Sequence, residues 1–584
     1  MKFRLRNIVL IAVFFAVLIG ILSNLDSDIE TLLKAGIASK KPAIVVNQVG
    51  YLPKWQKVAF LRQNTLANSQ IESQASATVI DRDTKQEVAT LAIESTGIDP
   101  DTKDAIATID FSDFTQPGNY YLSAGKYKSV PFAIGKDIYQ EPLVKLMRSY
   151  YIQRCGVAID DPVSGISHPP CHLSDGILAR NPSVKIDAVG GWHDGGAYNK
   201  YVATATATVG RLLSLYEQNL ELFPDNQLNI PQSGNGKSDL LDEMEFGLNW
   251  LLKMQREDGA VYRKVAGGSW VLDLAPDEDD QPRYVYGIST PETAKFAATM
   301  AIAARVFEPL DKQLGSKYLA AANLAWQYLQ TQAEMKVDWQ PEDDSGSDRY
   351  LASEFNTEPS LTTDLDDRFW AAAELYITTG KSGFADYVAA NLDRVEYTLF
   401  EWKNPAPLGM IDYLRQQRYP VSEAVVERIK AKLIERADLV LNIAEQNNYN
   451  IANNRFIWGS NRMTAEEGLT LVYAYQITNN ERYLNMAIAQ LDYLLGRNHF
   501  NQTFITDVGT NFVQNLSNLY ARAKQIEIPG LVVSGANATA QDGRVYRDRG
   551  QLSYADDQLA YASNGNATDY NASVISLIVN LITQ

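Results

Sequence analysis

Two hydrophobic patterns follow one another along this 584-residue chain. Short runs rich in β-branched and aromatic residues, separated by turn residues, extend over residues 42–135 and are typical of a small β-sandwich. Beyond residue 137 the apolar residues recur at helical spacing to the C-terminus. The pattern therefore predicts a β-sandwich followed by a large all-α domain. The predicted strands are 44–46, 58–61, 77–80, 105–109, 120–122 and 131–134.

The helical part contains about eleven or twelve predicted helices. Leu241, Met244, Leu248 and Leu251 form one apolar helical face. Thr290, followed by a proline, predicts a helix start with a capping hydroxyl. The other predicted helices lie at 198–216, 318–329, 369–376, 421–444, 465–475, 483–495 and 570–582.

The N-terminus carries basic residues before an uncharged apolar run at 8–22. This arrangement is typical of an export signal or a signal anchor. No small-residue cleavage motif is clear after the run, which favours an uncleaved anchor, and the polar residues 23–41 form a predicted linker. We expect an exported protein that meets the membrane through its N-terminal segment only, with its bulk periplasmic or extracellular.

The net charge is acidic, at −17. This charge argues against nucleic acid and against anionic membrane surfaces as partners. It suits a protein that acts on neutral material, and the 31 tyrosines offer ring faces for sugars.

The stretch 190–202, GGWHDGGAYNKYV, combines glycines with Trp192, His193 and Asp194. Glycines allow tight turns and close approach to a ligand. The aromatic ring, the imidazole and the carboxylate suit a carbohydrate cleft. The alternative is a glycine-rich loop that only caps a helix.

This stretch resembles GGWHDAGDYGKYV, a signature of family 9 glycoside hydrolases, the inverting β-1,4-glucanase (cellulase, endoglucanase) family. SDLLDEMEFGLNWLLKMQ, YLLGRNHFNQTFIT, LVVSGANATAQDG and DYNASVISLIVNL resemble further family segments in family order. AIVVNQVGYLPKWQKVAF resembles the immunoglobulin-like domain that precedes many bacterial members. The resemblance implies an anchor and linker at 1–41, an immunoglobulin-like β-sandwich at 42–135, and an (α/α)6 barrel at 137–584. It also implies a cellulose-like β-1,4-glucan as the substrate.

The positions that the resemblance aligns with the catalytic pair carry no carboxyl group. Asp194 takes the place of the aspartate that helps hold the water, but Ala197 stands at the general base and Gly565 at the general acid. The PHHR part of the family's sugar-binding NPHHR cluster aligns with Leu516–Leu519, and His499 replaces a family proline. Because each lost acid or base typically costs about 10² to 10⁴ in rate, the resemblance implies a hydrolysis that is lost or strongly reduced.

Three hypotheses follow. The first is a family 9 protein that binds a β-glucan without hydrolysing it. The second is an active glycosidase that uses Asp194 as the base and a relocated acid, with Asp569 as a weak candidate. The inverting reaction needs two carboxyl groups about 6.5–9.5 Å apart. The third is a protein-interaction scaffold.

Four aromatic residues are candidates for stacking on sugar rings. They are Trp192, Tyr198, Trp270 and Trp458. Aromatic platforms need no catalytic pair, so they are compatible with all carbohydrate-binding hypotheses.

Cys155, Cys171, His172 and His193 lie close together in the sequence. Two thiolates and two imidazoles form a closed tetrahedral zinc site, which is structural. The alternatives are a disulfide, as in many exported proteins, or two unrelated buried thiols. The RCG…HPPCH…GGWH pattern resembles that of zinc-binding family members and favours zinc.

A second ion is suggested by TTDLDDRFW, which resembles a calcium-binding segment of the family. Thr362, Asp366 and Asp367 would supply oxygen ligands, which suit a hard cation. The alternative is an acidic helix start stabilised by the helix dipole. The acidic run 276–280 predicts a solvated loop.

Overall fold

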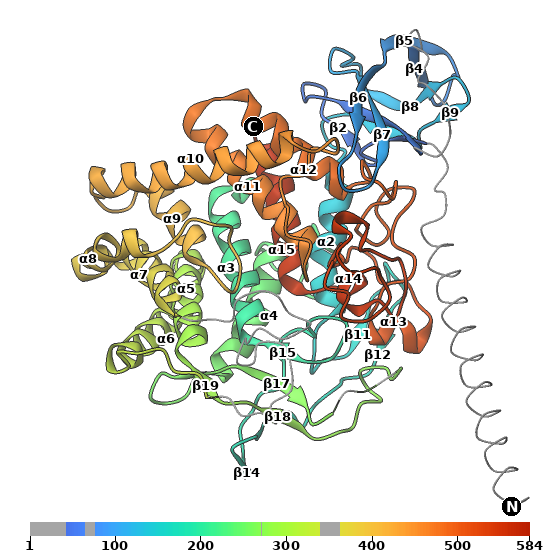
Figure 1. The fold of residues 1–584 in the computed structure, drawn as a ribbon. Helices are drawn as coiled ribbons and strands as arrows, with labels where there is room; N and C mark the ends of the chain where they lie inside the picture. Colours follow the sequence, from blue (N-terminus) through green and yellow to red (C-terminus); the bar gives the residue numbers. More distant parts are fainter. Residues whose placement is uncertain (1–42, 65–75, 270, 272, 339–362) are drawn as a thin grey trace, which may run out of the picture.

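The computed structural model describes residues 43–64, 76–269, 271, 273–338 and 363–584. Figure 1 shows a strand-rich part, in blue, at one corner of a larger helical part. The predicted anchor at 8–22 lies outside the described residues. Within them, we find no helix that combines the length and the apolar character needed to span a membrane.

The N-terminal part consists of two sheets packed face to face around one apolar core. The first sheet has the order β1-β3-β7-β6, and the second has the order β2-β10-β8-β4-β5 with β9 added to β8. All pairs are antiparallel except β2 with β10. The strands are β1 Ala43–Val45, β2 Gly50–Tyr51, β3 Val58–Asn64, β4 Ser76–Asp81, β5 Glu87–Ala92, β6 Glu94–Ile98, β7 Asp104–Asp110, β8 Gly118–Ala124, β9 Tyr127–Lys128 and β10 Phe132–Ile134.

All six predicted strands are present, as β1, β3, β4, β7, β8 and β10. Among the strands longer than two residues, the sequence pattern missed β5, whose Ala89 and Leu91 are only partly buried against the core, and β6. Every residue of β6 is exposed, and β5 has no buried residue. Strands that bury no face show no hydrophobic alternation, so periodicity cannot detect them.

The helical part is an (α/α)6 barrel, as expected. Six helices are buried on nearly every side and form the inner ring, and six bury one face against it. All residues of α5 are buried, whereas α10 buries a single stripe that begins Val425, Ile429, Leu433. The inner helices are α3 Val202–Gln218, α5 Thr290–Phe307, α7 Leu365–Thr379, α9 Ala406–Arg415, α11 Ser460–Thr478 and α15 Thr568–Ile582. The outer helices are α2 Gln140–Ile152, α4 Asp239–Lys253, α6 Lys312–Thr331, α8 Ser382–Asn391, α10 Glu423–Glu445 and α12 Glu481–Leu494.

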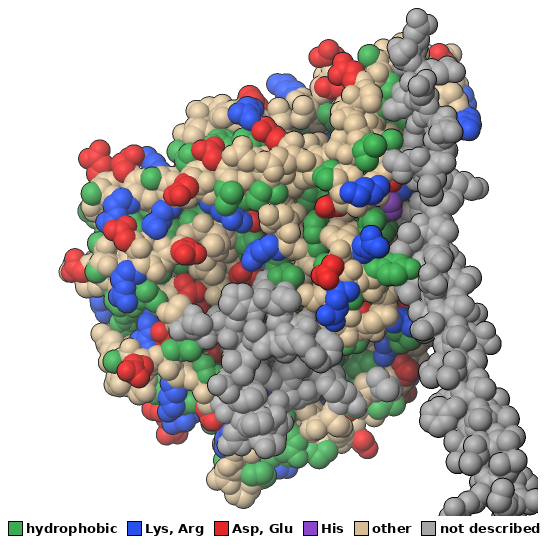
Figure 2. Space-filling model, viewed as in Figure 1, with side chains coloured by type: hydrophobic (Ala, Val, Ile, Leu, Met, Phe, Trp, Pro, Cys, Tyr) green, Lys and Arg blue, Asp and Glu red, His purple; other side chains and the backbone are tan. Residues whose placement is uncertain are grey.

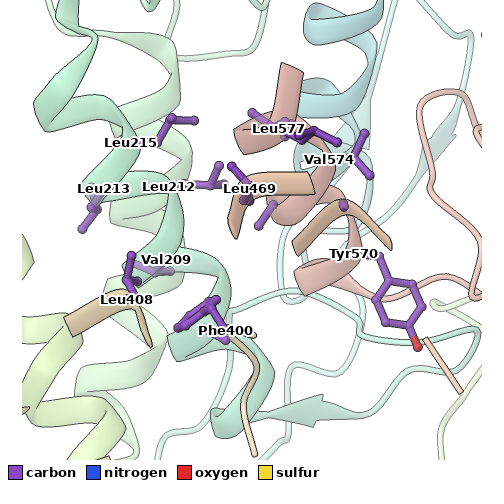
Figure 3. Close-up of a cluster of buried hydrophobic side chains, with 14 of the residues drawn as sticks. Val209, Leu212, Leu213, Leu215, Phe400, Leu408, Leu469, Tyr570, Val574 and Leu577 are labelled. Carbon is purple, nitrogen blue, oxygen red and sulfur yellow. The ribbon is translucent and has the colours of Figure 1, made fainter. Parts of the chain in front are cut away.

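The middle of the barrel is filled by side chains of the inner helices. Figure 3 shows Leu212 of α3 beside Leu469 of α11, with Val574 and Leu577 of α15 next to them. These side chains are fully buried. The barrel is therefore a packed core that holds the loops at its ends in fixed positions.

Short elements in the loops complete the helical part. A five-stranded sheet of order β14-β13-β18-β17-β15 lies below the barrel in Figure 1. Strand β15 leads directly into α3, so the glycine-rich stretch 190–199 is held between a sheet and an inner helix. The short elements are β11 Ile159–Asp160, β12 Ser167–His168, β13 Ile177–Leu178, β14 Asn181–Lys185, β15 Lys200–Tyr201, β16 Val261–Tyr262, β17 Lys264–Gly267, β18 Arg283–Val285, β19 Ile288–Ser289, α13 Leu519–Lys524 and α14 Tyr561–Asn564.

Helix α5 begins at Thr290, as predicted, but Thr290 does not supply the capping hydroxyl. The N-cap is Ser289, whose hydroxyl accepts a hydrogen bond from the Glu292 amide at 3.1 Å, and Thr290 is the first helical residue. Ser289 and Thr290 both carry a capping hydroxyl, so the residue type alone did not distinguish them.

Buried polar contacts join the sandwich to the barrel. Asp104 of β7 accepts a hydrogen bond from the Tyr449 hydroxyl at 2.6 Å, and its Oδ2 lies 2.5 Å from Nδ1 of His499. Asn47 donates from Nδ2 to Asp492 of α12 at 2.9 Å. His499, which departs from the family proline, thus has a structural role at the interface.

The surface carries charges of both signs. On the face shown in Figure 2, acidic and basic side chains of the described residues are interspersed. Neither sign of charge forms a large continuous patch among the described residues on this face.

Candidate functional site

The four predicted zinc ligands come together in one buried cluster. Their ligand atoms all lie within 4.8 Å of one another. Sγ of Cys155 lies 3.7 Å from Nδ1 of His172, and Sγ of Cys171 lies 3.6 Å from Nε2 of His193. The two imidazole nitrogens are 3.3 Å apart. A tetrahedral zinc ion would place its ligand nitrogens about 3.3 Å apart and sulfur and nitrogen about 3.6 Å apart, so the donor set fits zinc.

Local structure presents these donors. Cys155 follows α2, and its amide donates to the Gly191 carbonyl at 2.7 Å. His193 donates from its amide to the Gln153 carbonyl at 2.9 Å, so the two segments hold each other. Both cysteines are free, and no disulfide joins them. Burial lowers the pKa of His193 to about 4, which keeps the imidazole in the neutral form that binds metals.

Asp194 is fully engaged in hydrogen bonds. It is 4% exposed and accepts from the amides of Gly195 and Thr568, both at 2.9 Å, and from the Thr204 hydroxyl. Thr568 is the first residue of α15, so Asp194 satisfies a free amide at the N-terminus of that helix. Burial raises its pKa, and the hydrogen bonds oppose this change. Asp194 therefore links the segment before α3 to the N-terminus of α15.

Backbone carbonyl oxygens approach closely at Gly196, beside the position that the resemblance aligns with the base, and at Gly565, the position aligned with the acid. A Cβ at Gly196, next to Ala197, would lie 2.3 Å from the Ser517 carbonyl oxygen. A Cβ at Gly565 would lie 2.6 Å from the Tyr561 carbonyl oxygen and 3.7 Å from the same Ser517 oxygen. Both glycines are thus required by close backbone contacts.

Hydrogen bonds lock these three segments together. The Leu519 amide donates to the Gly196 carbonyl at 2.7 Å, and the Ser517 amide donates to the Asn564 carbonyl at 3.0 Å. The Asn518 side chain donates to Asn566 Oδ1 at 3.1 Å. The segment 516–519 consequently connects the glycine-rich stretch to the residues just before α15.

Asp569, the second residue of α15, is a buried carboxylate. Neither carboxylate oxygen accepts a hydrogen bond from another described residue, and Oδ2 lies 3.5 Å from Nε of Arg462. Arg462, Arg211 and Glu401 surround it in a space too small to hold a water molecule. Burial raises the pKa of Asp569 to about 7, against the effect of Arg462. It is better placed than Asp194 to hold and release a proton.

Two of the predicted sugar platforms are structural, which corrects the expectation. Trp192 is 3% exposed, and its indole donates to Glu243 at 2.8 Å. Its ring fills the space left by Gly247, where a Cβ would lie 2.2 Å from the indole. Tyr198 is 4% exposed and covers the His193 imidazole, with ring centroids 5.0 Å apart. Neither ring presents a free face.

Trp458 is accessible to a ligand, and Trp270 lies outside the described residues. Trp458 is 46% exposed and packs against Tyr561, which is 48% exposed, with ring centroids 5.8 Å apart. The sequence interpretation missed Tyr561. Its position on the segment that leads to Gly565 is the signal that points to it.

The predicted calcium segment contains buried carboxylates and a buried lysine. The oxygens of Asp366 accept no hydrogen bond among the described residues, and burial raises its pKa to about 6. Lys295 Nζ lies 2.6 Å from Asp367 Oδ1, and both side chains are fully buried. The Asp366 oxygens that accept no hydrogen bond suit a cation, although Lys295 already pairs with the carboxylate of Asp367. Thr362 lies outside the described residues.

Comparison with known proteins identifies the family. The family model described as glycosyl hydrolase family 9 matches residues 139–578, three quarters of the chain. This chain belongs to glycosyl hydrolase family 9. A model of the cellulase N-terminal ig-like domain matches residues 39–129 of this family 9 protein.

Relatives of this family 9 protein match over most of their length. The xyloglucan-specific endo-beta-1,4-glucanase of Bacteroides ovatus is 30% identical, over 92% of this chain and 93% of the relative. The crystal structure of a metagenome-derived glycoside hydrolase family 9 endoglucanase is 38% identical, with a TM-score of 0.86 over 93% of this chain and 99% of that one. A Zn-binding triple mutant of the family 9 endoglucanase J30 is 33% identical, with a TM-score of 0.83 over 91% and 99%.

Proposed function

We propose that this family 9 protein is exported, anchored through residues 8–22, and binds a β-1,4-linked glucan with little or no hydrolysis. The relative named as a xyloglucan-specific endo-beta-1,4-glucanase supports the glycan class. The observation that supports the loss of hydrolysis is the missing carboxyl pair: Ala197 and Gly565 carry no carboxyl group, and a Cβ at Gly565 would lie 2.6 Å from the Tyr561 carbonyl oxygen.

Glycan binding is assigned to the exposed pair Trp458 and Tyr561. Aromatic side chains bury a large apolar area when a ligand covers them, and they are common in binding sites for uncharged ligands. The test is retention on soluble β-glucans in affinity electrophoresis. Trp458→Ala should lose the retention, whereas Leu439→Ala, which removes another exposed apolar side chain, should keep it. Unretarded wild-type protein would reject glycan binding and favour the scaffold hypothesis.

An active glycosidase is the second candidate, because the pKa of Asp569 is raised by burial to about 7. A carboxylic acid that keeps its proton near neutrality can act as a general acid. Asp194 suits the base role poorly, because three donors already occupy its oxygens. Sugar release from a β-glucan that disappears in Asp569→Asn would establish this candidate.

Zinc is the metal that we propose for Cys155, Cys171, His172 and His193. The ion would pin the segment that carries Asp194 to the end of α2, a structural role without an open ligand position. Metal analysis should find one zinc ion per chain, and it should be absent from Cys155→Ser.

Calcium is proposed at Asp366 and Asp367, with Thr362 as a third ligand. It would satisfy the carboxylate oxygens of Asp366 that accept no hydrogen bond. Calcium should raise the melting temperature relative to a chelator of calcium, because a ligand that binds only the folded state stabilises it. An unchanged melting temperature would indicate that Lys295 alone balances this cluster.

A further inference from the structure

One acidic residue of the run 276–280 is buried, which corrects the prediction of a solvated loop. Asp277, Glu278 and Asp280 are exposed, but the side chain of Asp279 is 2% exposed. A carboxylate in such a position needs partners that compensate for the lost hydration. The partners of Asp279 lie at the edge of the proposed zinc cluster.

The His172 imidazole connects Asp279 to this cluster. Its Nδ1 faces Cys155 Sγ at 3.7 Å and His193 Nε2 at 3.3 Å, so Nδ1 is the atom directed at the metal position. Its Nε2 lies 3.4 Å from Asp279 Oδ2. A histidine that binds a metal through Nδ1 carries its proton on Nε2 and can donate it to that carboxylate.

The carboxylate is itself held in place. Gln281 donates from Nε2 to Oδ1 of Asp279 at 3.0 Å and to Oδ2 at 3.3 Å. Arg283 lies 4.0 Å from Oδ2, but its main partner is Asp175, at 2.7 Å. Asp279 therefore remains available as an acceptor for His172.

We propose that Asp279 is a positioning residue of the metal site. It accepts the Nε2 proton of His172, selects the tautomer that presents Nδ1 to the ion, and joins the loop before β18 to the cluster. This inference rests on the proposed zinc site. The ion would then hold three chain segments through its ligands and this loop through Asp279.

The test is the zinc dissociation constant of the full chain, measured with Zn²⁺ alone in competition with a chromogenic chelator. Loss of such a partner typically weakens metal binding about 10- to 100-fold, and we expect this loss for Asp279→Ala. The matched control is Asp280→Ala, which removes an exposed carboxylate from the next position and should leave the dissociation constant unchanged. The Co²⁺-loaded Asp279→Ala protein should also show altered ligand-field bands, which a purely structural role in the loop would not change.

Equal zinc dissociation constants for the two alanine variants would overturn the inference. If Asp279→Ala does not fold, the isosteric Asp279→Asn decides the question: a smaller loss of affinity supports the role, and wild-type affinity rejects it. Wild-type protein that binds no zinc would reject both the metal site and this inference. Zinc binding that is insensitive to position 279 would reject the inference alone.

Discussion

Replacing Gly565 by alanine tests whether the position that the resemblance aligns with the general acid has room for a side chain. The backbone φ of Gly565 is −82°, which alanine adopts without strain, so packing alone decides the effect. The new Cβ would meet the Tyr561 carbonyl oxygen at 2.6 Å, and backbone must move to relieve this contact. Overpacking of this kind costs about 1–3 kcal/mol. Alanine also restricts the unfolded chain, which stabilises the folded state by about 0.4–1 kcal/mol. We therefore expect the free energy of unfolding to fall by about 1–2 kcal/mol in total.

The matched control is Gly383→Ala in α8, where an added Cβ meets no atom within 4 Å. We expect this variant to be neutral or stabilised by up to about 1 kcal/mol, because alanine favours the helix. Urea unfolding followed by tryptophan fluorescence compares the two midpoints. A Gly565→Ala protein as stable as Gly383→Ala would refute the close contact. Space for an acid would then exist, and Gly565→Glu combined with Ala197→Asp could restore hydrolysis.

Three further predictions concern the metal, the domain interface and Asp569. Removing zinc with a chelator should lower the melting temperature in calorimetry, and Cys155→Ser should abolish the difference between treated and untreated protein. Burial would raise the pKa of Asp104, but hydrogen bonds from His499 and Tyr449 hold it below its usual value. Asp104→Asn should therefore destabilise the protein at neutral pH by about 1–3 kcal/mol in urea unfolding, and the difference should shrink as pH falls through the lowered pKa of Asp104. Because burial raises the pKa of Asp569 from 3.8 to about 7, the native state binds an extra proton between these values and loses stability as pH rises across them. Asp569→Asn should gain stability relative to wild type by up to about 4 kcal/mol between pH 4 and pH 8 in unfolding titrations, and a constant difference would contradict the raised pKa.

Much of the fold follows from residue patterns. The apolar stripe of α4 and the short strands of the sandwich core are detectable because each buries one face at a regular period. The exposed strand β6 has no such period. Inner helices such as α5 are buried all round, so composition and the family resemblance, rather than amphipathic spacing, indicate them.

The candidate site was predictable only where residue chemistry is restrictive. Two cysteines and two histidines close together in a sequence have few common roles, and zinc binding is one of them. The structure brings the four side chains together, as expected. Trp192 shows the opposite case, because an indole is equally common at a sugar-binding surface and in a core. Its burial depends on Gly247, a residue far away in the sequence that leaves space for the ring. Asp279 was missed for the same reason, since an acidic run does not reveal which carboxylate turns inward.

The most direct test of the central claim is reducing-sugar release by the zinc-loaded protein from a panel of β-1,4-glucans and xyloglucan. We predict no release above the blank, together with retention of the same glucans in affinity electrophoresis. Release by the wild-type protein that is lost in Asp569→Asn would contradict the claim and show that a relocated acid maintains hydrolysis.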